Sequence, residues 1–187
     1  MLERLRAVAA LSLALLALVF APRAEGSVAR AVTLRALVTR SALVATCTPL
    51  EATSRWENVG GRRRIVTDTR VRVDRRVAGE ALGGELIVRT LGGQVGEVGQ
   101  VVSGEAVLIP GEASLLFFTR RADGQLAVTA LAQGQFRLAP DAQGVVRLHP
   151  SPWRATLVDA RDSAARALAG RALPEATRLI EEAARAK

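Results

Sequence analysis

Residues 65–74 carry a strict two-residue alternation, and this pattern constrains the fold more than any other feature of the chain. The side chains at the odd positions are apolar or carry a small hydroxyl: Ile65, Thr67, Thr69, Val71 and Val73. The even positions from 68 onward are charged: Asp68, Arg70, Arg72 and Asp74. Successive side chains of a strand point to opposite faces, whereas a helix would spread both kinds around its surface. The segment is therefore predicted to be a long strand with one buried and one solvated face.

Further strands are predicted on both sides of this segment. An apolar stretch at residues 41–51 is ended or bent by Pro49, and residues 85–91 alternate again. Two hairpins are indicated, one joining residues 115–118 to 126–131 and one joining residues 135–138 to 145–148. Residues 57–61 and 92–104 are expected to be glycine-containing loops. Short strands without helices between them predict a mainly β fold, an antiparallel barrel or sandwich.

Helices are predicted only at the two ends of this β region. Residues 31–40 have apolar side chains near helical spacing, with Thr33 as the N-cap. Residues 157–168 and 174–186 are predicted helices separated by Gly170. The expected organisation is a β-barrel domain at residues 27–150, which includes the N-terminal helix, followed by a C-terminal helical tail at residues 151–187. That tail either packs on the barrel through Leu179, Ile180 and Ala183 or extends into solvent.

Residues 1–26 have the build of a secretory signal peptide. Arg4 and Arg6 precede an uncharged run at residues 7–21, which is shorter than the roughly 20 residues that a membrane-spanning helix needs. Cleavage is expected after Gly26, leaving Ser27 as the first residue, or alternatively after Ala24. The mature protein is therefore expected in the periplasm or outside the cell. Contact with a membrane is expected only through the signal peptide before cleavage.

The counts of reactive residues exclude several kinds of chemistry. The chain has one Cys and one His, so a zinc site built from Cys and His is excluded, and no catalytic triad is visible. No catalytic, cofactor-binding or metal-binding residue is identified, and no cofactor is expected. A site assembled from carboxylates and arginines stays open as an alternative. Cys47 lies in an apolar segment and is predicted to be buried, the other reading being a reactive thiol.

Two groups of residues are candidates for binding a partner. The chain carries 26 basic and 18 acidic groups, for a formal net charge of +8. The basic residues are densest around the alternating strand, where the candidates for a polyanion or an acidic partner are Arg62, Arg64, Arg70 and Arg72. The glycine-rich loop supplies a second candidate set: Gly93, Gln94, Glu97 and Gln100. Trp56 is the only aromatic residue near the arginines, so nucleic acid is not an expected partner.

The order of these elements resembles that of a known kind of small barrel. The shared signature consists of Gly92-Gly93, Gly111-Glu112, Phe117-Phe118, Asp123-Gly124 and Gln133-Gly134-Gln135-Phe136. Over residues 33–139 the chain resembles the netrin-like modules and the tissue inhibitors of metalloproteinases, and it looks still closer to exported bacterial proteins with this signature. The resemblance implies an OB-like β-barrel that presents loops to a partner.

The inhibitory mechanism of that family does not carry over. The family that the chain resembles inhibits its targets through an N-terminal cysteine, whose amine and carbonyl bind the zinc of the protease. Ser27 is the expected first residue here. The disulfides of the family are also missing, since Cys47 is the only cysteine. We therefore expect an exported, non-enzymatic binding or interaction module of the cell envelope or exterior. The alternatives are a protease-associated, inhibitor-like module and a polyanion-binding domain that uses the arginine-rich strand.

Overall fold

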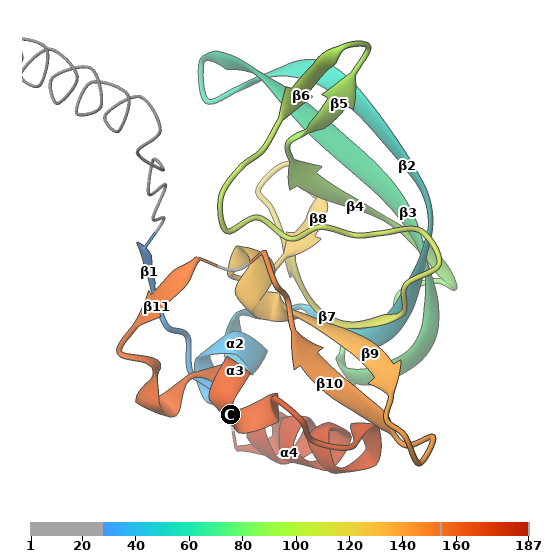
Figure 1. The fold of residues 1–187 in the computed structure, drawn as a ribbon, viewed down its shortest axis with the longest axis vertical. Coiled ribbons are helices and arrows are strands. Elements are labelled where there is room, and N and C mark those ends of the chain that lie inside the picture. The colour runs from blue at the N-terminus through green and yellow to red at the C-terminus, as the bar shows by residue number, and fades with distance from the viewer. Residues whose placement is uncertain (1–27, 154, 187) are drawn as a thin grey trace, which may run out of the picture.

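Two long strands, β2 (Leu43–Val59) and β3 (Arg62–Gly79), form the hairpin on which the fold is built (Figure 1). The computed structural model describes residues 28–153 and 155–186, so the expected signal peptide at residues 1–26 lies outside the described residues. The other strands are β1 (Val28–Arg30), β4 (Glu85–Leu91), β5 (Gly93–Val95), β6 (Val98–Gln100), β7 (Ser114–Arg120), β8 (Leu126–Val128), β9 (Gln135–Pro140), β10 (Val146–Pro150) and β11 (Thr156–Val158). The α-helices are α2 (Leu34–Arg40), α3 (Ala164–Leu168) and α4 (Leu173–Arg185), and the short 3-10 helices are η1 (Leu131–Gly134) and η2 (Ala160–Asp162). The expected mainly β fold is confirmed.

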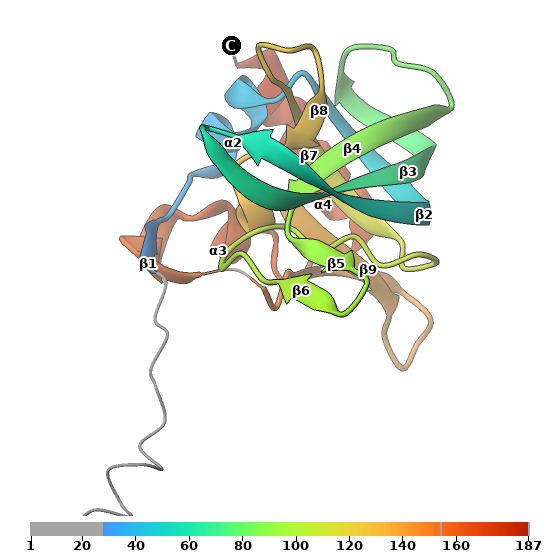
Figure 2. The same ribbon diagram turned by 90° about the horizontal axis from the view of Figure 1, so that it is seen from above.

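Seven strands make one sheet in the order β10-β9-β7-β2-β3-β4-β8, and β7 also pairs with β8. These pairings connect five strands in a ring, β7-β2-β3-β4-β8, in which β4 lies between β3 and β8 (Figure 2). All neighbours in the ring are antiparallel except β4 and β8, which are parallel at Val88 and Leu126. A ring with an odd number of strands cannot alternate direction throughout. The expectation of purely antiparallel pairing is therefore wrong at this closure, and also at β1, which pairs with β11 in parallel.

The first part of β2, residues 43–47, and most of β7 are buried on both faces, and this divides the apolar interior into two cores. Leu43, Ala45 and Cys47 of β2 point into the inner core, together with Leu116 and Phe118 of β7. The alternate residues point into a second core that the helices cover, which we call the helix-side core: Val44, Leu115 and Phe117. Because both faces are covered, these segments read as continuous apolar runs instead of alternating ones.

The β2–β3 hairpin is longer than the sequence suggests. The prediction of a loop at residues 57–61 is wrong for residues 57–59, because β2 continues to Val59. The turn consists of Gly60 and Gly61. Both glycines have positive φ, at 59° and 74°, as a two-residue hairpin turn of type I′ requires. Pro49 does not end β2, but the register of the pairing shifts between Pro49 and Glu51.

Two other segments differ from the expected structure. The glycine-rich segment 92–104 is not a simple loop, since it contains the small hairpin of β5 and β6. The helix expected at residues 157–168 begins only at Ala164. Its first part pairs with the N-terminal β1 as strand β11, a contact between segments that are far apart in the sequence. The helices α2, with Thr33 as its N-cap, and α4 agree with the prediction.

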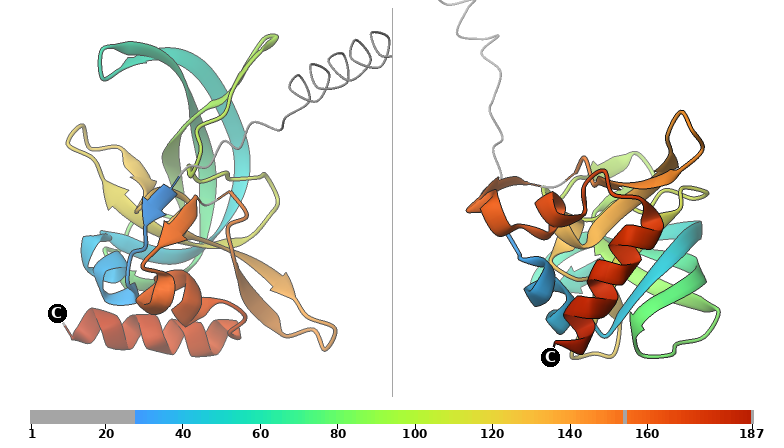
Figure 3. Two further views of the ribbon diagram at one scale, coloured as in Figure 1. Left: turned by 60° about the vertical axis from the view of Figure 1, so that its left-hand side comes forward. Right: turned by 90° about the horizontal axis from the view of Figure 1, so that it is seen from below.

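The three helices lie together at one end of the molecule, away from the tip of the β2–β3 hairpin (Figure 3). The C-terminal helix packs on the strands through Ile180, which is fully buried in the helix-side core, while Leu179 and Ala183 are partly buried against it. The tail therefore packs and does not extend into solvent. None of the helices among the described residues is long and apolar enough to cross a membrane.

Candidate functional site

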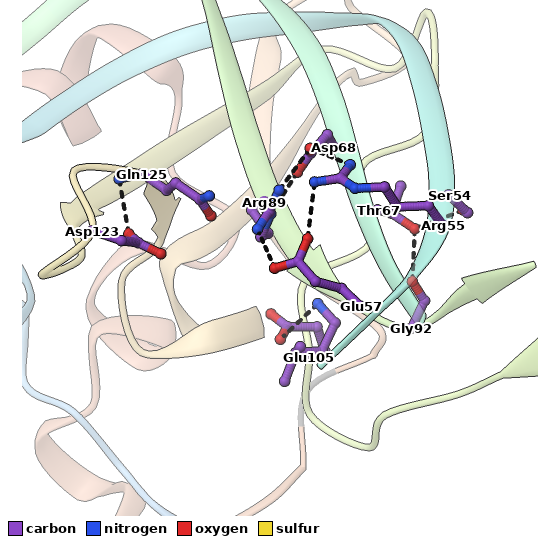
Figure 4. A network of polar contacts seen from close by, with 11 residues as sticks. Ser54, Arg55, Glu57, Thr67, Asp68, Arg89, Gly92, Glu105, Asp123 and Gln125 are labelled. Carbon is purple, nitrogen blue, oxygen red and sulfur yellow. Dashed lines mark hydrogen bonds and ion pairs between the residues drawn. The ribbon is translucent and has the colours of Figure 1, made fainter. Parts of the chain in front are cut away.

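Four charged side chains from β2, β3 and β4 form a closed network (Figure 4). Arg89 donates to Asp68 through Nε and Nη2, at 2.7 and 2.9 Å, and to Glu57 through Nη1 at 2.8 Å. Arg55 bonds the same two carboxylates, at 2.6 Å to Asp68 and 3.0 Å to Glu57. The hydrogen bonds from Arg89 are the main reason that the pKa of Asp68 lies below its usual range. Two positive and two negative charges cancel, so this network holds strands together and offers no free charge.

The structure separates the four candidate arginines into two pairs. Arg70 donates to Glu85 and Glu51 at 3.0 and 3.2 Å, and the bond to Glu85 is the first cause of its raised pKa. Arg72 donates from Nε to Asp74 at 2.7 Å. These carboxylates offset the charge of both arginines.

Arg62 and Arg64, by contrast, lie next to the Gly60-Gly61 turn and form no ion pair with any described residue.

Three arginines at the end of the hairpin form no ion pair with a described residue, and together with the neighbouring tryptophan we call them the arginine tip: Trp56, Arg62, Arg63 and Arg64. Glu57 lies opposite Arg64 in the pairing of β2 with β3, but its carboxylate bonds Arg55 and Arg89 instead. The Arg63 guanidinium carbon lies 4.9 Å from the centroid of the Trp56 ring, a cation–π contact. Arg62 and Arg63 are exposed, and Trp56 keeps 36% of its surface exposed. Arg63 and Trp56 are not among the candidate binding residues that the sequence indicates, because their contact depends on the register of β2 against β3.

Two of the candidate loop residues contact β2 and β3, and the other two form no hydrogen bond with either strand. The Gln100 side chain accepts a hydrogen bond from the Ile65 backbone N–H at 2.9 Å, which ties the β5–β6 hairpin to β3. Gly93 faces the hydroxyls of Ser54 and Thr67 so closely that a Cβ would lie 2.3 Å from the Thr67 oxygen. Gln94 and Glu97, at the other end of the hairpin, are exposed. These last two are the candidates whose side chains form no hydrogen bond or ion pair with β2 or β3.

A small hollow of about 290 Å³ lies beside the parallel pair of β4 and β8. Arg89, Arg120 and Gln125 line it, and Figure 4 shows the Gln125 side chain directed toward Arg89. The buried Oε1 atom of Gln125 has no hydrogen-bond donor within the described part of the chain. Both arginines already bond carboxylates, Arg120 to Glu80 at 3.1 Å. The hollow is thus polar but has little free charge.

A second hollow, of about 430 Å³, lies between the chain that follows β6 and the segment after β10. We call it the Glu105 pocket, and the side chains that define it are Leu91, Val101, Glu105, Val107, Pro152 and Trp153. Glu105 is only 4% exposed, and its carboxylate accepts hydrogen bonds from the backbone N–H groups of Leu91 and Ala106 at 3.3 and 3.0 Å. Burial raises the pKa of Glu105 above its usual value. No sequence motif marks this pocket.

Another hollow, of about 760 Å³, lies beside α3 and is lined mostly by alanine and proline, with Arg161 and Arg166 exposed at it. None of the described residues that line it is both buried and charged.

The geometry bears on two kinds of chemistry, metal binding and the reactivity of the Cys47 thiol. No three His, Cys, Asp or Glu side chains within residues 28–153 and 155–186 come together as metal ligands would. Cys47 is fully buried, which confirms the prediction, and burial raises the pKa of its thiol to about 12, with a smaller contribution from Asp74. A thiol of that pKa is neither a nucleophile nor a metal ligand at neutral pH.

No protein-family model matches the chain, and a search of the curated proteins finds no match.

Proposed function

We propose that the chain is an exported, non-enzymatic binding module of the cell envelope or exterior that attaches to an acidic polysaccharide through the arginine tip. The observation that carries the proposal is the contrast along β3. Arg62, Arg63 and Arg64 form no ion pair with any described residue, and Glu57, opposite Arg64, bonds two other arginines. Arg70 and Arg72, in contrast, are neutralised by their carboxylate partners. Uncompensated charges attract a polyanion, because binding releases the counterions of the polymer.

The position and composition of the arginine tip support a polymer as the ligand. The tip lies at the end of a projecting hairpin, so a long chain can pass it without meeting the helices (Figure 1). The Trp56 ring offers an apolar surface beside the charges, suited to the face of a sugar ring. A single aromatic residue is too little to stack successive bases, which argues against single-stranded nucleic acid.

The proposal includes an OB-like barrel as the finer description of the five-strand ring. In support, β2, β3, β4, β8 and β7 follow one another around the ring with one parallel closure. Barrels of this type bind their ligands on the face of the second and third strands and at the adjacent loops. The turn that carries the arginine tip connects the first and second strands of the ring, so it lies at the expected place.

The test compares two variants that remove the same charge. In the purified protein, Arg62→Ser with Arg64→Ser is compared with Arg70→Ser and Arg72→Ser for affinity to heparin over a range of salt concentrations. We expect the first variant to bind more weakly and to lower the salt slope by about one per arginine removed, and the second to change little. Equal losses in both variants would contradict a role of the tip. Stronger binding to anionic vesicles than to heparin would replace the polysaccharide with a lipid surface.

A further inference from the structure

We propose that the Glu105 pocket is a second binding site, which takes a small organic cation that carries an ammonium group on an apolar body. This site does not depend on the arginine tip and has the opposite charge. Its evidence is a buried carboxylate that forms no ion pair with a described residue, inside a hollow whose walls are mostly apolar.

The carboxylate of Glu105 is only partly satisfied. Each of its oxygens accepts a single backbone hydrogen bond, although a carboxylate oxygen can accept more than one. Glu105 forms no ion pair with any described residue, and the charged group that acts on it is Arg121, at a distance. A buried charge is costly unless a cation or further donors accompany it. An ammonium group would supply both, because it has a positive charge and several N–H donors.

The walls of the pocket suit an apolar body next to that ammonium group. Val101 is 87% exposed and Trp153 is 50% exposed, so apolar surface faces the hollow without a cover from the described chain. A volume of about 430 Å³ lies within the range of small-molecule sites, roughly 300–1,000 Å³. The face of a tryptophan ring also attracts a cation. The pocket therefore combines an electrostatic anchor with apolar contacts.

Other ligand classes fit this pocket less well. An anion would be repelled by Glu105, and a neutral apolar molecule would leave the buried carboxylate without a counter-charge. A metal ion would need more ligands than one carboxylate, and among the described residues no second acidic side chain lines the pocket. An organic cation is the class that matches both the charge and the walls.

The experiment uses phenethylammonium as the probe, with phenethyl alcohol as its neutral counterpart. Trp153 and Trp56 are the two tryptophans of the chain, so Trp56→Phe leaves Trp153 as the fluorescent reporter. We expect phenethylammonium to shift the Trp153 fluorescence at lower concentration than the alcohol does. Glu105→Gln should lower the affinity for the cation by about tenfold or more and leave the affinity for the alcohol unchanged, as loss of a charged hydrogen bond implies. Glu182→Gln on the exposed side of α4 removes the same charge and should have no effect.

Two outcomes would overturn the proposal. One is equal affinity for the ammonium and the alcohol, and the other is an unchanged affinity for the ammonium in Glu105→Gln. If Glu105→Gln does not fold, the exposed substitution Val101→Lys serves instead, since it adds a positive charge to the wall and should abolish binding of the cation. A concentration-dependent dimer without discrimination between the probes would show that a second copy of the chain covers the pocket. Failure here leaves the arginine tip untouched, because heparin binding is measured separately.

Discussion

At the scale of single residues, burial decides the chemistry of two ionisable groups. Cys47 and Glu105 are both ionisable and both enclosed, and in each the pKa is raised mainly by loss of water. For Cys47 the surroundings are apolar and the thiol becomes inert. For Glu105 the surroundings include a hollow, so the same physical effect creates a candidate anchor for a cation.

The raised pKa of Cys47 predicts a loss of stability in alkali. The unfolded chain releases the proton near the ordinary pKa of 9.0, whereas the folded protein keeps it up to about 12. The unfolded state therefore binds fewer protons between these values, so this residue leaves stability unchanged below pH 9.0 and lowers it as the pH rises toward 12. The expected cost is about 1.4 kcal/mol per pH unit in that window. Urea unfolding of the wild type and Cys47→Ala at about pH 8 and about pH 10 measures it.

The stability difference between those two proteins should shrink at the higher pH, because Cys47→Ala has no thiol to titrate. A constant difference would show that Cys47 ionises equally in both states.

At the scale of elements, side-chain contacts between neighbouring strands keep the long β2–β3 hairpin attached to the rest of the ring. The four-charge network joins β2, β3 and β4 on one side of it. The β5–β6 hairpin lies against its other side through Gln100 and Gly93. Charges and glycines that appear solvated or flexible in the sequence thus have a structural role.

Replacement of Asp68 tests the network. In Asp68→Asn, the guanidinium of Arg89, whose side chain is 9% exposed, keeps Glu57 as its only carboxylate. We expect the free energy of unfolding to fall by about 2–4 kcal/mol, as for other pairs that lose one buried partner. Asp74→Asn removes an ion pair with the more exposed Arg72 and should cost less than about 1 kcal/mol. Chemical unfolding of the two variants measures both costs, and equal costs would disprove a special role of the network.

The contact of the small hairpin is tested by two glycines within it. Gly93 has a φ of 128° and no room for a Cβ beside Ser54 and Thr67, whereas Gly99 has nothing within 4 Å of that position. We expect Gly93→Ala to destabilise the protein by about 1–3 kcal/mol and to release the hairpin from β3. Gly99→Ala should stay within about 0.5 kcal/mol of the wild type. Amide hydrogen exchange of Ile65, whose N–H bonds Gln100, should increase in the first variant and not in the second.

At the scale of the whole molecule, two cores share the strands β2 and β7, and the C-terminal helix closes the second core. Ile180 and Ala176 are fully buried there with Leu37 and Phe117. The arginine tip lies at the opposite end of the molecule from these helices (Figure 3). The stability of the fold and the proposed binding surface are therefore spatially separate.

Truncation of a single side chain tests whether the tail belongs to the fold. Ile180→Ala should lower the free energy of unfolding by about 2–5 kcal/mol, because it leaves a cavity in the helix-side core. Arg178→Ala, on the exposed side of the same helix, should change it by less than about 0.5 kcal/mol. Two-state urea unfolding provides the measurement. A small effect of Ile180→Ala would mean that α4 packs loosely on the strands.

The elements whose pattern is local could be predicted from the sequence alone. The alternation in β3 and β4, the Gly-containing turns of two hairpins, the Thr33 cap of α2 and the helix α4 all depend on residues within a few positions of one another. Side-chain periodicity and turn conformation act over that range, so these predictions are confirmed. The same local rules predicted a helix where β11 forms. That strand depends on its pairing with β1, which is far away in the sequence and therefore outside the range of these rules.

Only the tertiary structure decided which charges are free and where a pocket lies. Arg70 and Arg62 look alike in the sequence, but strand register brings Glu51 and Glu85 to Arg70 and no carboxylate of the described chain to Arg62. The Glu105 pocket likewise combines residues 91–107 with Pro152 and Trp153. The sequence by itself determined the strands and turns whose pattern is local, and the total charge. Pairing between distant segments decided the rest, because electrostatic and apolar contacts depend on distance in space and not along the chain.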